Sequence, residues 1–219
     1  MNTPPQDAES VTHLWLTRWF ERLRSQHGTI GATVVFGSFP AGIVLTYAVA
    51  RWSYMNPTYL YSLLAILVVT SVAPYLIWYY DSTLFPEFRT KVDPLIQADG
   101  VVAAIGKRYH TLLAKRWWLA AVLASLPIPV LLYVGDPFLT QRGLFGGSDL
   151  LFWIVGGLLL WIGVIVGIGF LLVAITFLAI RDVAAEPLEI DPMHPDGLGG
   201  MSAIGQYAIR TTTLFSLGA

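Results

Sequence analysis

The chain contains no cysteine and few charged residues. Of its 219 residues, 55% are hydrophobic and 12% are charged, and the mean hydropathy is +0.63. The absence of cysteine excludes disulfides, thiol chemistry and cysteine ligation of zinc or iron–sulfur clusters. Soluble domains carry about 25% charged residues, so this scarcity of charge indicates an integral membrane protein. The net charge of −1 gives no support for binding nucleic acid.

Four runs without Asp, Glu, Lys or Arg are long enough to cross a bilayer, which requires about 20 residues at about 1.5 Å each. We expect the spans at about residues 29–50, 59–80, 117–135 and 150–180. The fourth run is so long that it must tilt strongly or protrude from the membrane. Transmembrane β-strands are much shorter and alternate in polarity, which these runs do not. The predicted fold class is therefore all-α, a polytopic helical membrane protein.

Lysine and arginine are distributed unequally between the two sides of these spans. Nine of them lie before the first span or between the second and third, whereas the other two connections hold only Arg51 and Arg142. The positive-inside rule then places the N-terminus, the loop 81–116 and the segment after the fourth span in the cytoplasm. Residues 1–28 lack a signal-peptide cleavage pattern, so we expect the first span to be retained in the plasma membrane.

The leader, residues 1–28, contains a candidate amphipathic helix. Apolar residues recur there at near-helical spacing, with arginines between them: Val11, Trp15, Trp19 and Leu23. This pattern predicts a helix that lies in the membrane interface while its arginines reach toward water. The alternative is that Trp15, Trp19 and Phe20 cover the bundle.

Two further segments are expected to be helical. Apolar spacing over residues 92–113 predicts a cytoplasmic amphipathic helix that runs into the third span, although Gly100 and Gly106 weaken its continuity. Residues 200–219 read as the start of a fifth hydrophobic helix with Arg210 in its middle. Arginine at a bilayer centre costs about 2.5–3.5 kcal/mol. Either this helix is short and interfacial, or the chain is the N-terminal part of a longer protein, which we favour.

The ten residues 191–200, "DPMHPDGLGG", join the fourth span to this last segment. One interpretation is a divalent metal site, because carboxylates and imidazole suit Zn²⁺, Mn²⁺ or Fe²⁺. Its candidate ligands are Asp191, His194 and Asp196, completed by a histidine from His13, His27 or His110.

Two other interpretations use the same residues. Free N–H groups at a helix N-terminus could form an anion cradle with Gly197, Gly199 and Gly200. Alternatively the segment is only a turn, since residues before proline avoid the α region and Asp-Gly favours turns. All three interpretations place a structured elbow here.

The same segment resembles a known signature. "HPDGLGGM", after four predicted spans, resembles the HPD-x-x-GG-L motif of uncharacterised prokaryotic multi-pass membrane proteins, with Met201 in place of leucine. The resemblance implies a similar layout with further hydrophobic helices after the motif. It implies no catalytic role for His194 or Asp196.

Glycines in the fourth span predict close helix packing. Gly163 and Gly167 form a GxxxG motif, and Gly156 lies two turns earlier on that face. Small residues let helix backbones approach closely, either within the chain or between two copies in a homo-oligomer. The spans contain no ionisable residue, which argues against a proton pump or voltage-gated channel built from these helices alone.

These observations favour a membrane scaffold or sensor-like protein with a cytoplasmic functional face and the lipid bilayer as its partner. A transporter or channel subunit is the first alternative, since prolines within the spans can interrupt helices. A membrane metalloenzyme that uses the elbow residues is the second. The sequence assigns no enzymatic activity, and no cofactor is predicted apart from the metal of this second alternative.

Overall fold

The computed structural model describes residues 13–54, 56–98, 100–142, 150–188 and 201–216. This part of the chain is helical and contains four segments long and apolar enough to cross a membrane, as predicted. In chain order the elements are α1 (Trp15–Ala50), η1 (Trp52–Tyr54), α2 (Pro57–Tyr79), η2 (Tyr80–Leu84), α3 (Phe85–Val92), η3 (Asp93–Leu95), α4 (Val101–Ser125), α5 (Pro127–Gln141), α6 (Leu150–Ala184) and α7 (Ser202–Ser216).

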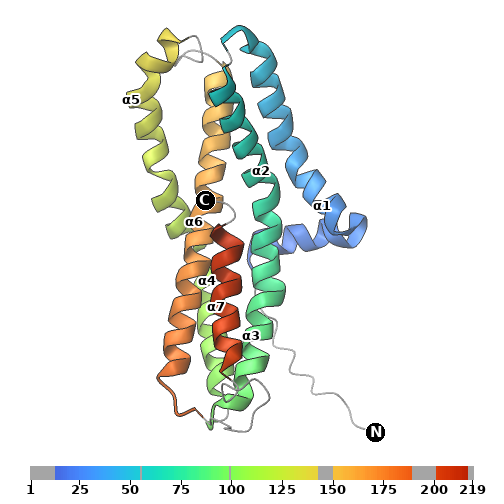
Figure 1. Cartoon of the computed structure of the whole chain (residues 1–219), viewed down its shortest axis with the longest axis vertical. Helices are drawn as coiled ribbons and strands as arrows, with labels where there is room; N and C mark the ends of the chain where they lie inside the picture. The colour runs from blue at the N-terminus through green and yellow to red at the C-terminus, as the bar shows by residue number, and fades with distance from the viewer. Residues whose placement is uncertain (1–12, 55, 99, 143–149, 189–200, 217–219) are drawn as a thin grey trace.

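Helix α1 bends sharply at Gly28, whose φ of 70° lies in the left-handed region that glycine tolerates. Residues 15–27 lie across the bundle, and the rest of α1 runs along it (Figure 1). These residues, together with His13 and Leu14 directly before them, are here called the crosswise segment. The crosswise segment also packs against the bundle: Trp15 contacts Trp117 and Trp161, with ring centroids 5.6 and 6.1 Å away. Phe20 is fully buried, which contributes about 1.5–3 kcal/mol.

The second span begins at Asn56, whose side chain accepts a hydrogen bond from the Tyr59 N–H at 3.0 Å and so caps α2. Helix α2 passes through one π-helical turn, η2, directly into α3. The chain then breaks, and α4 starts after Gly100, which has a φ of 78°. A single helix over residues 92–113 is therefore a wrong prediction, although α4 does continue into the third apolar run.

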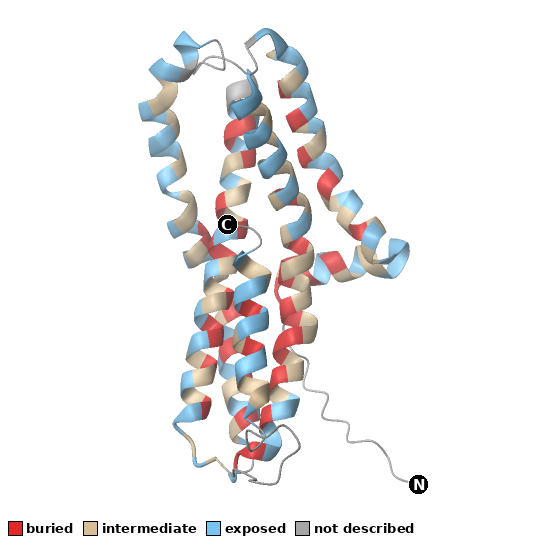
Figure 2. Cartoon of the chain, in the orientation of Figure 1, coloured by how far each residue is buried: buried red, intermediate tan, exposed pale blue. Residues whose placement is uncertain are grey.

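One end of the bundle is here called the extension: it comprises η2, α3, α7 and the adjoining ends of α4 and α6. Buried side chains concentrate in this end, whereas the other end exposes much apolar surface (Figure 2). Phe39 and Tyr133, for example, are 74% and 84% exposed. Large exposed apolar patches mark a surface for membrane or protein contact, and here they fit lipid. The last turns of α6 reach into the extension, where Asp182 accepts a 2.6 Å hydrogen bond from Tyr109.

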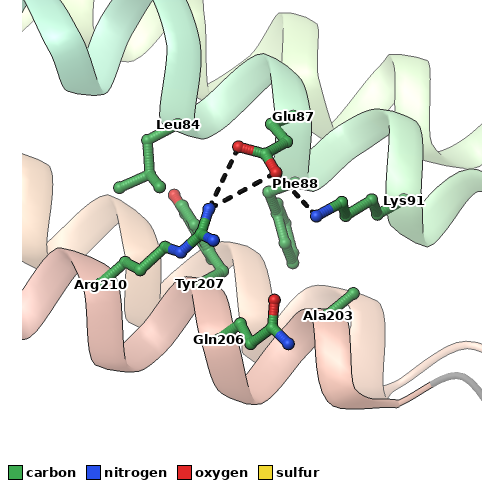
Figure 3. Close-up of a pocket in the computed structure, with 8 residues that line it drawn as sticks. All are labelled: Leu84, Glu87, Phe88, Lys91, Ala203, Gln206, Tyr207 and Arg210. Carbon is green, nitrogen blue, oxygen red and sulfur yellow. Dashed lines mark hydrogen bonds and ion pairs between the residues drawn. The ribbon is translucent and has the colours of Figure 1, made fainter. Parts of the chain in front are cut away.

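The predicted fifth hydrophobic helix is α7, which packs against α6 and α3. Its Arg210 faces a shallow pocket and forms an ion pair with Glu87 of α3 at 3.3 Å (Figure 3). Glu87 also pairs with Lys91 at 2.7 Å, and these charges hold the pKa of the Glu87 carboxyl below its usual value. Arg210 is therefore paired with an acidic side chain and does not face lipid as an unpaired charge.

Because this ion pair is solvent-exposed, it should contribute little to stability. Replacing Arg210 with glutamine is expected to lower the free energy of unfolding by no more than about 1 kcal/mol, an effect that high salt should erase. Thermal unfolding at low and high salt measures it, with Gln206→Ala on the same helix as the control. A loss of several kcal/mol that salt does not change would show that Arg210 holds α7 by other means.

Candidate functional site

A buried carboxylate lies where the crosswise segment meets the extension. Asp81 is 0% exposed and belongs to the π-helical turn that joins α2 to α3. Local π-helical turns are frequent at functional sites because they shift the register of side chains. An ionised side chain is almost never fully buried unless it is paired, so the partners of Asp81 determine what this site can do.

Two oxygens of Asp81 face two different parts of the chain. One oxygen, Oδ2, accepts a hydrogen bond from the Leu14 backbone N–H at 3.3 Å and lies 3.3 Å from His13 Nδ1. The other, Oδ1, lies 3.6 Å from Nδ1 of His110 on α4, beyond hydrogen-bond distance, and has no partner among the described residues. Asp81 thus hydrogen-bonds to the start of the crosswise segment with one oxygen and faces α4 with the other.

His13 and His110 differ in their environments. His13 is 38% exposed, and the pKa of its imidazole is raised, first by the hydrogen bond to Asp81 and against the opposing effect of burial. His110 is 6% exposed, and neither of its ring nitrogens has a partner among the described residues. The two rings meet edge to face with centroids 6.0 Å apart. A proton on His13 would give Asp81 a counter-ion, so the pair of His13 and Asp81 can hold or release a proton.

Arg89 of α3 adds a positive charge near His110. A Cβ placed on Gly106 would lie within 2.8 Å of the Arg89 side chain, so glycine at this position lets the arginine lie against α4. Its Nε is buried without a partner among the described residues. The site therefore contains one carboxylate, two imidazoles and a nearby guanidinium, and its charge depends on the histidines.

A hydroxyl network lies next to Asp81 and fixes α7. Tyr80 bonds to the Tyr207 hydroxyl at 2.6 Å and to Thr176 Oγ1 at 3.0 Å, while Thr176 donates to Tyr207 at 3.2 Å. Burial raises the pKa of Tyr207 to about 12, so the hydroxyl stays protonated. Since these residues belong to η2, α6 and α7, a displacement at Asp81 would be felt by all three elements.

The elbow residues of the metal and anion hypotheses lie outside the described residues: Asp191, His194, Asp196, Gly197, Gly199 and Gly200. Their roles stay predictions. The chain just before them is held near the loop between α3 and α4, where Gln97 N–H donates to the Pro187 carbonyl at 3.5 Å. Within the described ranges, no group of three or more His, Asp or Glu side chains could hold a metal ion.

Two of the glycines that were predicted to allow close helix packing contact another helix of the same chain. A Cβ on Gly167 would lie 2.4 Å from the backbone oxygen of Ala120 in α4, and one on Gly163 would lie 2.9 Å from the Cα of Ser125. Gly156 has only the Leu132 side chain near it, at 3.5 Å. The face carrying Gly163 and Gly167 is thus occupied by α4.

Sequence reasoning missed Asp81, although a signal existed. Asp81 follows a long apolar run and shares a helical face with Ile77, Leu84 and Phe88, all of which are buried. A single acid on an otherwise apolar face predicts a buried, paired carboxylate. Comparison with protein-family models, curated proteins and solved structures gives no match, so the site is interpreted from its geometry.

Proposed function

We propose that this chain is a sensor-like integral membrane protein in which the crosswise segment controls the extension through Asp81. The observation that supports this most is the position of Asp81: one oxygen contacts His13 and the Leu14 N–H, and the other faces His110. A movement of the crosswise segment that left the Asp81 carboxylate buried would remove its hydrogen-bond partners, and an unpaired buried charge costs several kcal/mol. The crosswise segment and the extension are therefore expected to move together.

The expected orientation completes the proposal. The arginines of the crosswise segment and the basic residues of α3 and α4 favour the cytoplasmic side of the plasma membrane for this end of the molecule. The crosswise segment then lies at the membrane surface, with Trp19 54% exposed on it. Tryptophan is enriched at that depth. A surface helix joined to a cytoplasmic bundle is an arrangement suited to sensing.

The sensing site should respond to pH through His13. The groups that face this imidazole are Asp81 and Glu21, which favour its charged form, Arg18, which opposes it, and the His110 ring. Because the pKa of His13 is raised in the folded protein, its stabilisation is complete below about pH 6.5, the ordinary histidine value. The stabilisation is lost as the pH rises through the raised pKa.

Thermal unfolding of the purified protein at pH 6 and pH 8.5 tests this. We expect a higher melting temperature at pH 6, with hydrogen exchange in α3 and α7 faster at pH 8.5 after correction for intrinsic rates. His13→Ala should abolish both differences, while His27→Ala, at an exposed position of the crosswise segment, should leave them. If exchange in α3 and α7 ignores His13, the crosswise segment does not control the extension.

A further inference from the structure

A cavity of about 680 Å³ lies in the angle between the crosswise segment and the end of α2. Its lining combines arginines with hydroxyl groups: Thr17, Arg18, Arg22, Arg24, Ser82 and Thr83. It is separate from the buried site formed by Asp81, His13, Leu14 and His110, here called the junction, which it reaches only at His13. Its size and lining are suited to a polar group of ligand size rather than to an apolar side chain.

The charge of this cavity is positive. Glu21 is the acidic residue in its lining, and it is already occupied by Arg24 at 2.6 Å and by the Trp78 indole N–H at 2.7 Å. Arg18 and Arg22 are exposed and form no ion pair within the described part of the chain. Among the described residues, these two guanidinium groups are therefore available to bind an anion.

The wall of the cavity also contains Thr17, which is 3% exposed. Its Oγ1 is buried without a hydrogen-bond partner among the described residues, so this oxygen does not face the cavity. The arginines therefore provide the donors that a ligand in the cavity would meet.

We propose that this cavity binds a phosphate group, supplied by the headgroup of an anionic membrane lipid. Guanidinium groups match phosphate oxygens with paired N–H donors, and Arg18 and Arg22 present two such groups in the lining of the cavity. The lipid source follows from the location of the cavity, since headgroup phosphates lie at the depth of a surface helix. The proposal rests on the proposed function only in placing the crosswise segment at the membrane surface.

Binding of short-chain phosphatidylglycerol to the purified full-length chain tests this, with short-chain phosphatidylcholine and inorganic phosphate as the other probes. Arg18→Gln/Arg22→Gln should weaken phosphatidylglycerol binding at least about tenfold, because both guanidinium groups and their charge-assisted hydrogen bonds to the phosphate are removed. Lys115→Gln/Arg116→Gln removes the same charge from an exposed part of α4 outside the cavity and should change binding less than twofold.

The control pair separates binding in this cavity from general electrostatic attraction to a basic surface. Equal weakening by both arginine-site and control pairs, or equal binding of phosphatidylcholine, would overturn the proposal. Inorganic phosphate that binds as tightly as phosphatidylglycerol would overturn the lipid source and leave a phosphate site.

The result is independent of the switch described above. Lipid binding that depends on Arg18 and Arg22, together with an extension that ignores His13, would refute the proposed function and retain this site. A pH response that depends on His13, together with lipid binding that ignores Arg18 and Arg22, would refute this site and retain the proposed function.

Discussion

Replacing Asp81 with alanine is expected to lower the free energy of unfolding by about 3–5 kcal/mol, the usual cost of removing one partner from a buried charged group. The Leu14 N–H would lose its acceptor, and His13 and His110 would face one another without the carboxylate between them. Denaturation in detergent, followed by tryptophan fluorescence, measures the change, because Trp15 lies next to this junction.

Asp93→Asn is the matched control, since Asp93 is an exposed acid on the same side of the molecule. It should change stability by less than about 0.5 kcal/mol. Asp81→Asn keeps the size of the side chain but not its charge, so its loss of stability should lie between those of Asp81→Ala and Asp93→Asn. Equal effects of Asp81→Ala and Asp93→Asn would mean that the buried carboxylate does not stabilise the junction.

Replacing Gly167 with leucine is expected to lower the free energy of unfolding by about 3 kcal/mol and to separate α4 from α6 locally. The new Cβ would lie 2.4 Å from the Ala120 oxygen and 2.9 Å from the Ala121 Cα, so the clash is with backbone and not with a side chain that could rotate away. Overpacking of this kind forces whole elements to shift. The measurement is again detergent unfolding, with the tendency to aggregate monitored by size-exclusion chromatography.

Gly157 provides the comparison on the same helix. It is exposed, and a Cβ there would meet no heavy atom within 4 Å, so Gly157→Leu should be tolerated. If the two leucine variants are equally stable, the close approach of α4 and α6 at Gly167 does not exist in the membrane-embedded protein.

The helical membrane fold could be predicted because its signal is local. Long charge-free runs have few alternatives to spanning helices, since unsatisfied backbone groups are too costly in lipid. The kink at Gly28 and the break before Gly100 were harder to predict from the sequence. Other described glycines do not have a positive φ, so the presence of a glycine does not by itself mark a break in a helix. Gly100 did mark the point where the predicted helix over residues 92–113 fails.

The candidate site could not be predicted in the same way. Asp81 meets His13 across 68 positions of the sequence, and His110 reaches it from another helix. Such meetings depend on the packing of α1, α2 and α4, which no local spacing specifies. The sequence drew attention instead to Asp191, His194 and Asp196, whose function stays a prediction.

The most direct test of the central claim is the distance between the crosswise segment and the extension. The chain lacks cysteine, so spin labels can be placed by Gln26→Cys and Thr90→Cys alone, both at exposed positions, and measured by pulsed electron paramagnetic resonance in lipid nanodiscs. One narrow distance distribution is predicted, which broadens in Asp81→Asn and stays unchanged in Asp93→Asn. An identical narrow distribution in Asp81→Asn would contradict control of the extension through Asp81.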